Sequence, residues 1–179
     1  MMKYSTIETD RIVLRFLTHN DINDMLLYRN NINVSKYQGF EPNYTKESMK
    51  EFINTHSTEK IDPKISWIQI GIEYNNKIIG DIGVHIENIG CDYYQAQVGI
   101  TLNPDYQGKG IAYEAMNVLI KFLFLNWSCH RIYGEIDVRN IKSINLFKKL
   151  NFRQEAHFIN NYYFKNEWTS VFIYAMLNE

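Results

Sequence analysis

The sequence contains little cysteine and little proline. Its two cysteines among 179 residues, Cys91 and Cys129, stand in no Cys-x-x-Cys or cysteine–histidine spacing, so neither a disulfide framework nor a metal site is indicated. Only 3 prolines occur, and no stretch rich in proline, glycine or serine divides the chain. We therefore expect one domain over residues 1–179, long enough to bury a single continuous core.

An excess of charge and a long apolar run are also missing. The formal net charge is −1, so no global field attracts nucleic acid or an acidic membrane surface, and we expect neither as a partner. The beginning of the chain, MMKYSTIETDR, has no apolar signal-peptide core. No run approaches the roughly 18 apolar residues of a membrane helix. We expect a soluble, cytoplasmic protein with reduced thiols.

The hydrophobic residues, 45% of the chain, follow two periods. Alternation predicts strands at residues 11–17, 66–74, 78–86, 95–102 and 131–138, and a closing hairpin that turns at residues 165–167. Helical spacing predicts a helix that begins after Thr18 or Asn20, and others at residues 45–56, 110–127 and 143–150. This order predicts an α/β fold with a mixed, mostly antiparallel central sheet and helices on both faces.

The stretch YQGKGIAYEAM places Gly108 and Gly110 around a lysine, just before a predicted helix. Each glycine costs about 1 kcal/mol of backbone entropy relative to alanine. A helix start offers free N–H groups and a positive dipole end, and glycine keeps side chains out of a phosphate's way. The stretch matches neither the Walker A pattern nor GxGxxG. On the glycines alone, an anion site and a ligand-free turn are equally open.

Four blocks of the chain, taken in order, resemble the GNAT family of N-acetyltransferases. QGKGIA (107–112) fits the family's acyl-CoA signature, and NIKSINLFKKLNF (140–152) is similar to its second block. Residues 9–21 and 152–177 are similar to the RimJ/RimL-like subgroup, so the likeness covers almost the whole chain. The resemblance implies the acyl-CoA N-acyltransferase fold, in which the fourth and fifth strands splay apart, with acetyl-CoA (coenzyme A) as cosubstrate and no metal.

The resemblance also assigns cosubstrate-binding residues. The pantetheine arm would lie along the backbone of Val98, Ile100 and Leu102 like an added strand. A second set would hold the pyrophosphate through backbone amides: Gln107, Gly108, Lys109, Gly110, Ile111 and Ala112. Asn140 would bond to pantetheine, cap the helix at Ser143, or do both. Ser143 and Phe147 complete the expected binding site.

Acetyl transfer to an amine needs a neutral amine, a polarised thioester carbonyl and a stabilised thiolate. The resemblance assigns the polarisation to a strand amide near Ile100. Many members have a tyrosine where this chain has Phe147, whose ring donates no hydrogen bond. Ser143 is therefore the candidate donor to the thiolate, although a serine at a helix start also commonly caps the backbone.

The general base is harder to assign. RimL-like members often carry a glutamate where this chain has Gln97, which cannot take a proton. Glu135 and Asp137 share one face of the next strand, so either is a candidate base that acts through a water. His85 is a further candidate. Asn151 replaces the family's glycine, but asparagine tolerates the left-handed backbone of a helix end.

We therefore expect an acetyl-CoA-dependent N-acetyltransferase, an acyltransferase enzyme. The acceptor amine is open between the N-terminus of a ribosomal or other protein and a small amine such as a polyamine or aminoglycoside. The alternative is a catalytically weak acyl-CoA-binding or sensing module, which Phe147 and Gln97 favour. A homodimer is also open. Six aromatic residues are candidates for the acceptor wall: Tyr37, Trp67, Tyr93, Tyr94, Tyr162 and Tyr163.

Overall fold

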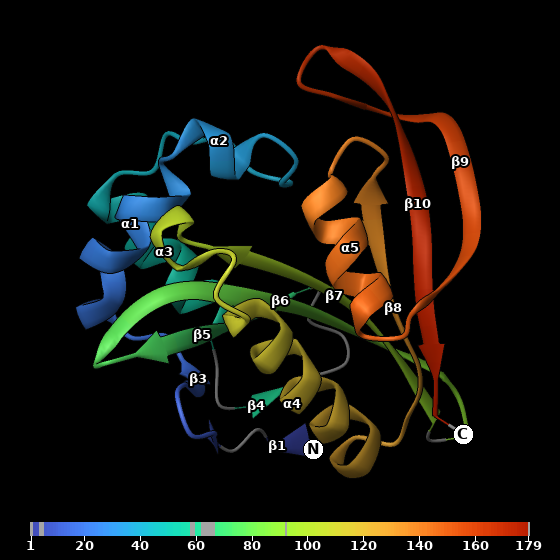
Figure 1. Cartoon of the computed structure of the whole chain (residues 1–179). Coiled ribbons are helices and arrows are strands. Elements are labelled where there is room, and N and C mark those ends of the chain that lie inside the picture. Colours follow the sequence, from blue (N-terminus) through green and yellow to red (C-terminus); the bar gives the residue numbers. More distant parts are fainter. Residues whose placement is uncertain (1, 4–5, 58–59, 62–66, 92, 179) are drawn as a thin grey trace.

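A computed structural model describes residues 2–3, 6–57, 60–61, 67–91 and 93–178, and its main feature is a sheet of eight strands (Figure 1). In spatial order these are β2 (Ile7–Glu8), β3 (Val13–Phe16), β5 (Ile68–Tyr74), β6 (Lys77–Gly90), β7 (Tyr93–Leu102), β8 (Cys129–Asp137), β10 (Glu167–Leu177) and β9 (Arg153–Phe164). Neighbouring strands run antiparallel except β7 and β8, which run parallel. The predicted mixed, mostly antiparallel sheet is confirmed. A separate antiparallel pair joins β1 (Met2–Lys3) to β4 (Lys60–Ile61).

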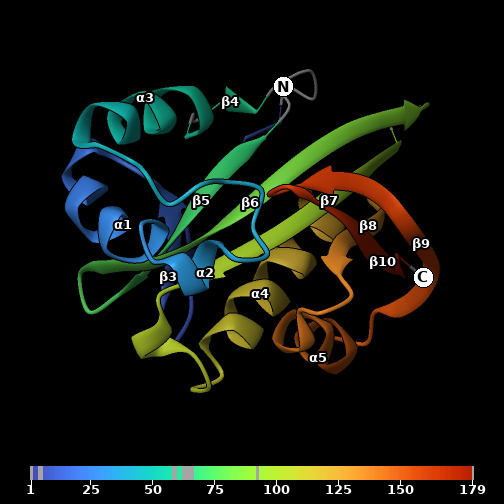
Figure 2. The same cartoon turned by 90° about the horizontal axis from the view of Figure 1, so that it is seen from above.

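Helices cover both faces of the sheet, as predicted (Figure 2). On one face, α1 (Ile22–Arg29) and α3 (Lys46–His56) enclose a cluster that contains Met25, Met49 and Ile53. On the other, α4 (Ile111–Asn126) and α5 (Ile141–Lys149) pack on the larger core. The chain also forms α2 (Ile32–Ser35) and two short 3₁₀ helices, η1 (His19–Asp21) and η2 (Pro104–Tyr106).

Local sequence explains where the main elements begin and end. Thr45 caps α3, because its hydroxyl accepts the N–H of Ser48 at 3.1 Å. Asn151 ends α5 with φ +65°, the left-handed conformation expected for it. The strands β1, β2 and β4 and the helix α2 were not predicted, because two to four residues are too few to show a period. Ser66, predicted to begin a strand, lies outside the described residues.

The sheet opens at its centre, where β7 and β8 part. Their pairing runs only from Tyr94 with Cys129 to Gln97 with Tyr133. Beyond Gln97, no described strand neighbours that edge of β7, and Figure 1 shows the two strands diverging. This is the splay expected from the resemblance. In the part of the chain that the structure describes, no helix is both long and apolar enough to cross a membrane.

Candidate active site

The parted edge of β7 presents backbone groups to the gap. Just past the strand, the N–H of Asn103 donates to the carbonyl of Ile79 in β6 at 2.8 Å. In an antiparallel strand, the N–H and C=O of one residue point to the same side, and successive residues alternate. The odd-numbered residues therefore face β6, whereas Val98, Ile100 and Leu102 face the gap. An extended ligand with amide groups can pair with this edge.

Two of these gap-facing carbonyls bond to glutamine side chains. Ile100 O accepts from Gln38 Nε2 at 3.2 Å, and Leu102 O accepts from Gln107 Nε2 at 2.9 Å. A side-chain amide thus already stands where a ligand amide would donate. Sequence reasoning missed Gln38, because its contact with Ile100 joins residues 62 positions apart.

The glycine turn lies at the far end of this edge. Gly108 and Gly110 have φ values of +75° and +80°, which side-chain-bearing residues rarely adopt, so the backbone itself favours glycine at both positions. Gly110 is the N-cap of α4, and the first N–H groups of a helix have no partner within it. The predicted pyrophosphate residues therefore lie on a turn with free amides at a positive dipole end.

Two basic side chains border the turn. Arg11 Nη1 donates to the carbonyl of Lys109 at 3.1 Å, and Arg11 also forms an ion pair with Glu114 in the first turn of α4. Because C=O and N–H point in opposite directions across a trans peptide, this bond directs the Gly110 N–H away from Arg11. Lys142 Nζ lies 2.9 Å from Gln107 Oε1. Sequence reasoning missed Arg11 and Lys142, since no local motif marks either.

The start of α5 carries the residues predicted from the second block. Asn140 is the N-cap, and its Oδ1 accepts the N–H of Ser143 at 3.2 Å. The Ser143 side chain is half-buried, and its hydroxyl forms no hydrogen bond within the described residues. Phe147 is 1% exposed, and its ring fills the space above Gly134, where a Cβ would lie 2.5 Å from it. Phe147 is thus a packing residue behind the gap.

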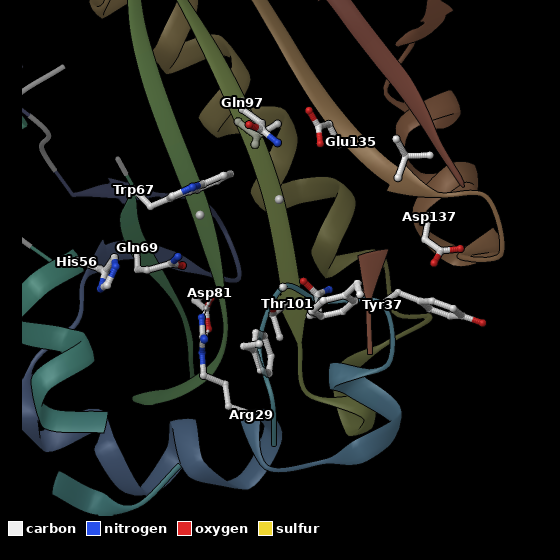
Figure 3. A pocket seen from close by; sticks show the side chains of 18 of the residues that line it. Arg29, Tyr37, His56, Trp67, Gln69, Asp81, Gln97, Thr101, Glu135 and Asp137 are labelled. Carbon is white, nitrogen blue, oxygen red and sulfur yellow. Dashed lines mark hydrogen bonds and ion pairs between the residues drawn. The ribbon is translucent and has the colours of Figure 1, made fainter. Parts of the chain in front are cut away.

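A cleft of about 740 Å³ opens on the face that α1 and α3 cover (Figure 3). It reaches the point where the strands part, since Gly99 of β7 and Glu135 of β8 line it. Of the six aromatic candidates, Tyr37, Trp67 and Tyr162 line the cleft. The other three lie elsewhere: Tyr93 at a smaller hollow, Tyr94 against the core, and Tyr163 on the β9–β10 hairpin.

The two candidate bases differ in their surroundings. Glu135 lies two residues beyond the last residue of β8 that pairs with β7, is exposed, and forms no ion pair within the described residues. Asp137 is bound by Arg139, with Nη2 2.6 Å from Oδ2 and Nε 2.9 Å from Oδ1. Burial would raise the pKa of Asp137, but the hydrogen bonds and charge of Arg139 outweigh it and hold that pKa below its ordinary value. Of the two candidates, Glu135 is thus the carboxylate without an ion-pair partner among the described residues.

Neighbouring groups place both carboxylates at one end of the cleft. Glu135, Asp137 and Tyr162 all line the cleft, and burial, followed by the charges of the two carboxylates, raises the pKa of Tyr162. Gln97 of β7 lies near Glu135 (Figure 3). Its Oε1 accepts a hydrogen bond from the hydroxyl of Tyr133 at 3.4 Å. His85 instead lies against Trp67 in a tilted ring contact, at 5.6 Å between ring centroids.

A buried ion pair anchors the opposite end of the cleft. Arg29 Nη2 lies 2.7 Å from Asp81 Oδ1, and the hydroxyl of Tyr28 donates to Asp81 Oδ2 at 2.6 Å. The rings of Phe40 and Phe52 cover the guanidinium, at 4.7 and 4.3 Å from their centroids. The pair joins α1 and the cleft wall to β6 (Figure 3). The sequence carries a signal for it, because Asp81 interrupts the apolar strand IIGDIGV and a buried charge requires a partner.

Comparisons with known proteins agree with this arrangement. The model of the acetyltransferase (GNAT) domain family matches residues 11–153. An uncharacterised N-acetyltransferase, YnaD of Bacillus subtilis (strain 168), is 30% identical over 173 residues, which cover 97% of each chain.

Solved structures share the fold. The spermidine N-acetyltransferase of Vibrio cholerae, in complex with CoA and spermine, superposes with a TM-score of 0.78 at 24% identity, over 94% of this chain and 96% of that one. RimL, a ribosomal L7/L12 alpha-N-protein acetyltransferase in complex with coenzyme A, superposes with a TM-score of 0.84 at 17% identity, over 97% of this chain and 98% of that one. At these identities the likeness establishes the fold alone.

Proposed function

Because the chain belongs to the acetyltransferase (GNAT) family of N-acetyltransferases, we propose that it uses acetyl-CoA to acetylate a primary amine held in the cleft. One observation carries the proposal: the unpaired edge of β7 meets the cleft at one end and the glycine turn of α4 at the other. A ligand with a diphosphate, an extended amide-bearing arm and a terminal thioester fits these three parts in order.

The binding roles follow from the contacts. The pantetheine arm pairs with the gap-facing groups of Val98, Ile100 and Leu102, and displaces the Gln38 side chain from Ile100. The pyrophosphate takes the free amides of the glycine turn, where Lys142 adds positive charge and Arg11 holds the turn through the Lys109 carbonyl. Asn140 continues to cap α5 by accepting the N–H of Ser143. Because both residues stand at the start of α5, Asn140 also lies at the pantetheine site.

The chemistry follows from the groups at the parting of the strands. A neutral amine attacks the thioester carbon, and its proton passes through a water to Glu135. The N–H of Ile100 stabilises the negative charge on the carbonyl oxygen. When the C–S bond breaks, the leaving thiolate accepts a hydrogen bond from the Ser143 hydroxyl and is released as the thiol after taking up a proton. Asp137 is the weaker alternative base, because Arg139 neutralises it.

A catalytically weak acyl-CoA-binding module is the second candidate function. The observation that favours it is the buried Phe147 ring, which leaves the second block without a phenol donor. The two functions differ in whether binding of acetyl-CoA leads to turnover.

A thiol-release screen separates them. Acetyl-CoA is mixed with the protein and with ribosomal N-terminal peptides, polyamines or amino-sugar antibiotics, and free thiol and acetylated amine are both measured. We expect thiol and acetylated amine in equal amounts with at least one amine class. Tight acetyl-CoA binding by calorimetry, without thiol above the protein-free rate for any amine, would favour the binding module.

A further inference from the structure

The cleft floor contains a glycine that the fold does not need. At two other strand glycines a side chain would clash, since a Cβ would lie 2.4 Å from Thr101 O at Gly80 and 2.5 Å from Phe147 at Gly134. At Gly99 a Cβ would meet nothing within 4 Å, and its φ is not positive. A strand glycine lowers stability, and one without a packing reason marks a place where a ligand approaches the backbone.

A flat aromatic surface lies next to this unfilled place. Gly83 of β6 is the register partner of Gly99, and the ring of Trp67 covers it, with Cε3 3.1 Å from the Cβ position of Gly83. Trp67, Gly83 and Gly99 all line the cleft. The floor therefore offers the face or edge of an indole beside bare backbone, a shape suited to a flat, apolar group.

Two buried polar atoms of the same cleft have no partner. Gln69 Oε1 and Thr169 Oγ1 are buried without a hydrogen bond among the described residues, and both side chains line the cleft. Thr169 is only 4% exposed. Leaving a buried polar atom without a partner is unfavourable, so a ligand that donates a hydrogen bond to either atom is favoured over one that cannot.

The charges of the cleft favour a single ammonium group. Three carboxylates line it, but Asp81 is paired with Arg29 and Asp137 with Arg139. Among the described residues, only Glu135 of the three has no ion-pair partner. A polyamine carries several positive charges, and only one of them could pair with an unpaired carboxylate of the cleft.

From these four observations, and resting on the proposed function, we infer that the acceptor is a monoamine with a flat body. The body lies over Gly99 beside Trp67, its amine reaches Glu135, and a hydrogen-bond donor on the body meets Gln69 or Thr169. This class differs from the polyamines.

A panel of four amines tests the class. Tryptamine has a flat body and an N–H donor, 2-phenylethylamine has a flat body without one, hexylamine is a slender monoamine, and spermidine is a polyamine. Thiol release gives kcat/KM for each amine, calculated with the concentration of its neutral form. We expect tryptamine to exceed spermidine by about 10-fold or more, the discrimination that one fitted group supplies. Spermidine equal to or better than tryptamine would overturn the inference while leaving the proposed function intact. No thiol with any amine, here and in the wider screen, would overturn both.

Two variants test the placement. Gly99→Val should lower kcat/KM for tryptamine about 10-fold or more, because the side chain fills the unoccupied place. Its acetyl-CoA affinity by calorimetry and its melting temperature report whether cosubstrate binding and the fold survive. Thr169→Val and Gln69→Leu together should abolish the preference for tryptamine over 2-phenylethylamine while 2-phenylethylamine turnover is kept. A Gly99→Val protein that binds acetyl-CoA and turns over tryptamine like wild type would contradict the placement.

Discussion

Replacing Asp81 with asparagine tests the ion pair that holds the cleft wall on the sheet. Arg29 is 3% exposed and Asp81 is 1% exposed, so water cannot replace the lost charge. In the wild type, Arg29 and the Tyr28 hydroxyl both donate hydrogen bonds to Asp81. The NH₂ group of the new asparagine would face one of these donors and could not accept its hydrogen bond. Removing one partner of such a buried pair costs about 3–5 kcal/mol.

This loss is large enough to measure by thermal unfolding. A chain of this length loses roughly 2–4 °C of melting temperature per kcal/mol, so Asp81→Asn should lower it by about 6–20 °C. The unfolding midpoint in urea should fall as well. The affinity for acetyl-CoA, measured well below the melting temperature, should change little, because the Asp81 side chain binds Tyr28 and Arg29 on the cleft face and not the glycine turn.

Glu73→Gln is the matched control. Glu73 also pairs with an arginine, at 2.6 Å from Arg15 Nε, but the two side chains are 20% and 26% exposed. An accessible pair contributes about 0–1 kcal/mol, so this variant should lose a few degrees at most. Equal and small losses for Asp81→Asn and Glu73→Gln would refute the reasoning, because they would mean that burial of the Arg29–Asp81 pair has no consequence.

Four further predictions concern single residues. Gly110→Ala should weaken acetyl-CoA binding in calorimetry, because alanine at φ +80° costs about 1–2 kcal/mol and the turn that presents its amides would shift; unchanged affinity would exclude the turn as the pyrophosphate site. Ser143→Ala should lower turnover and leave acetyl-CoA affinity nearly unchanged, because the bond to sulfur strengthens as charge develops. Glu135→Gln should slow acetyl transfer by about 10²–10⁴-fold if Glu135 alone is the base. The rate that remains should rise with pH as the acceptor amine loses its proton. A smaller loss would mean that Asp137 substitutes for Glu135. Burial raises the pKa of Asp21, but hydrogen bonds and charge from Arg15 outweigh it and lower that pKa below the ordinary 3.8. Asp21→Asn should therefore be less stable than wild type at neutral pH. The difference between their urea midpoints should vanish as the pH falls below 3.8 and through the lower pKa of folded Asp21.

The parts of the site that follow the chain locally could be predicted from sequence. The glycine turn, the helix that follows it and the start of α5 each depend on residues within a few positions of one another. The left-handed conformation of Gly110 and Asn151 agrees with the residue types found there. The family resemblance, and not alternation, assigned Val98, Ile100 and Leu102 to the cosubstrate, and the backbone groups of these three residues face the gap.

Contacts between distant segments of the chain could not be predicted in the same way. The contact of Gln38 with Ile100, that of Arg11 with Lys109, and the Arg29–Asp81 pair each join segments more than 50 residues apart. Such contacts depend on how α1 and the first strands fold against the sheet, which periodicity does not report. The spacing of Glu135 and Asp137 likewise did not reveal that Arg139 occupies only Asp137.

Amide hydrogen exchange along β7, with and without acetyl-CoA, tests most directly whether the parted edge is the cosubstrate site. The N–H groups of Ile100 and Leu102 face the gap, whereas those of Gly99 and Thr101 already face β6. We predict that acetyl-CoA slows exchange at Ile100, at Leu102 or at both, and leaves Gly99 and Thr101 nearly unchanged. Exchange at Ile100 and Leu102 that is the same with and without saturating acetyl-CoA would contradict this account of the site.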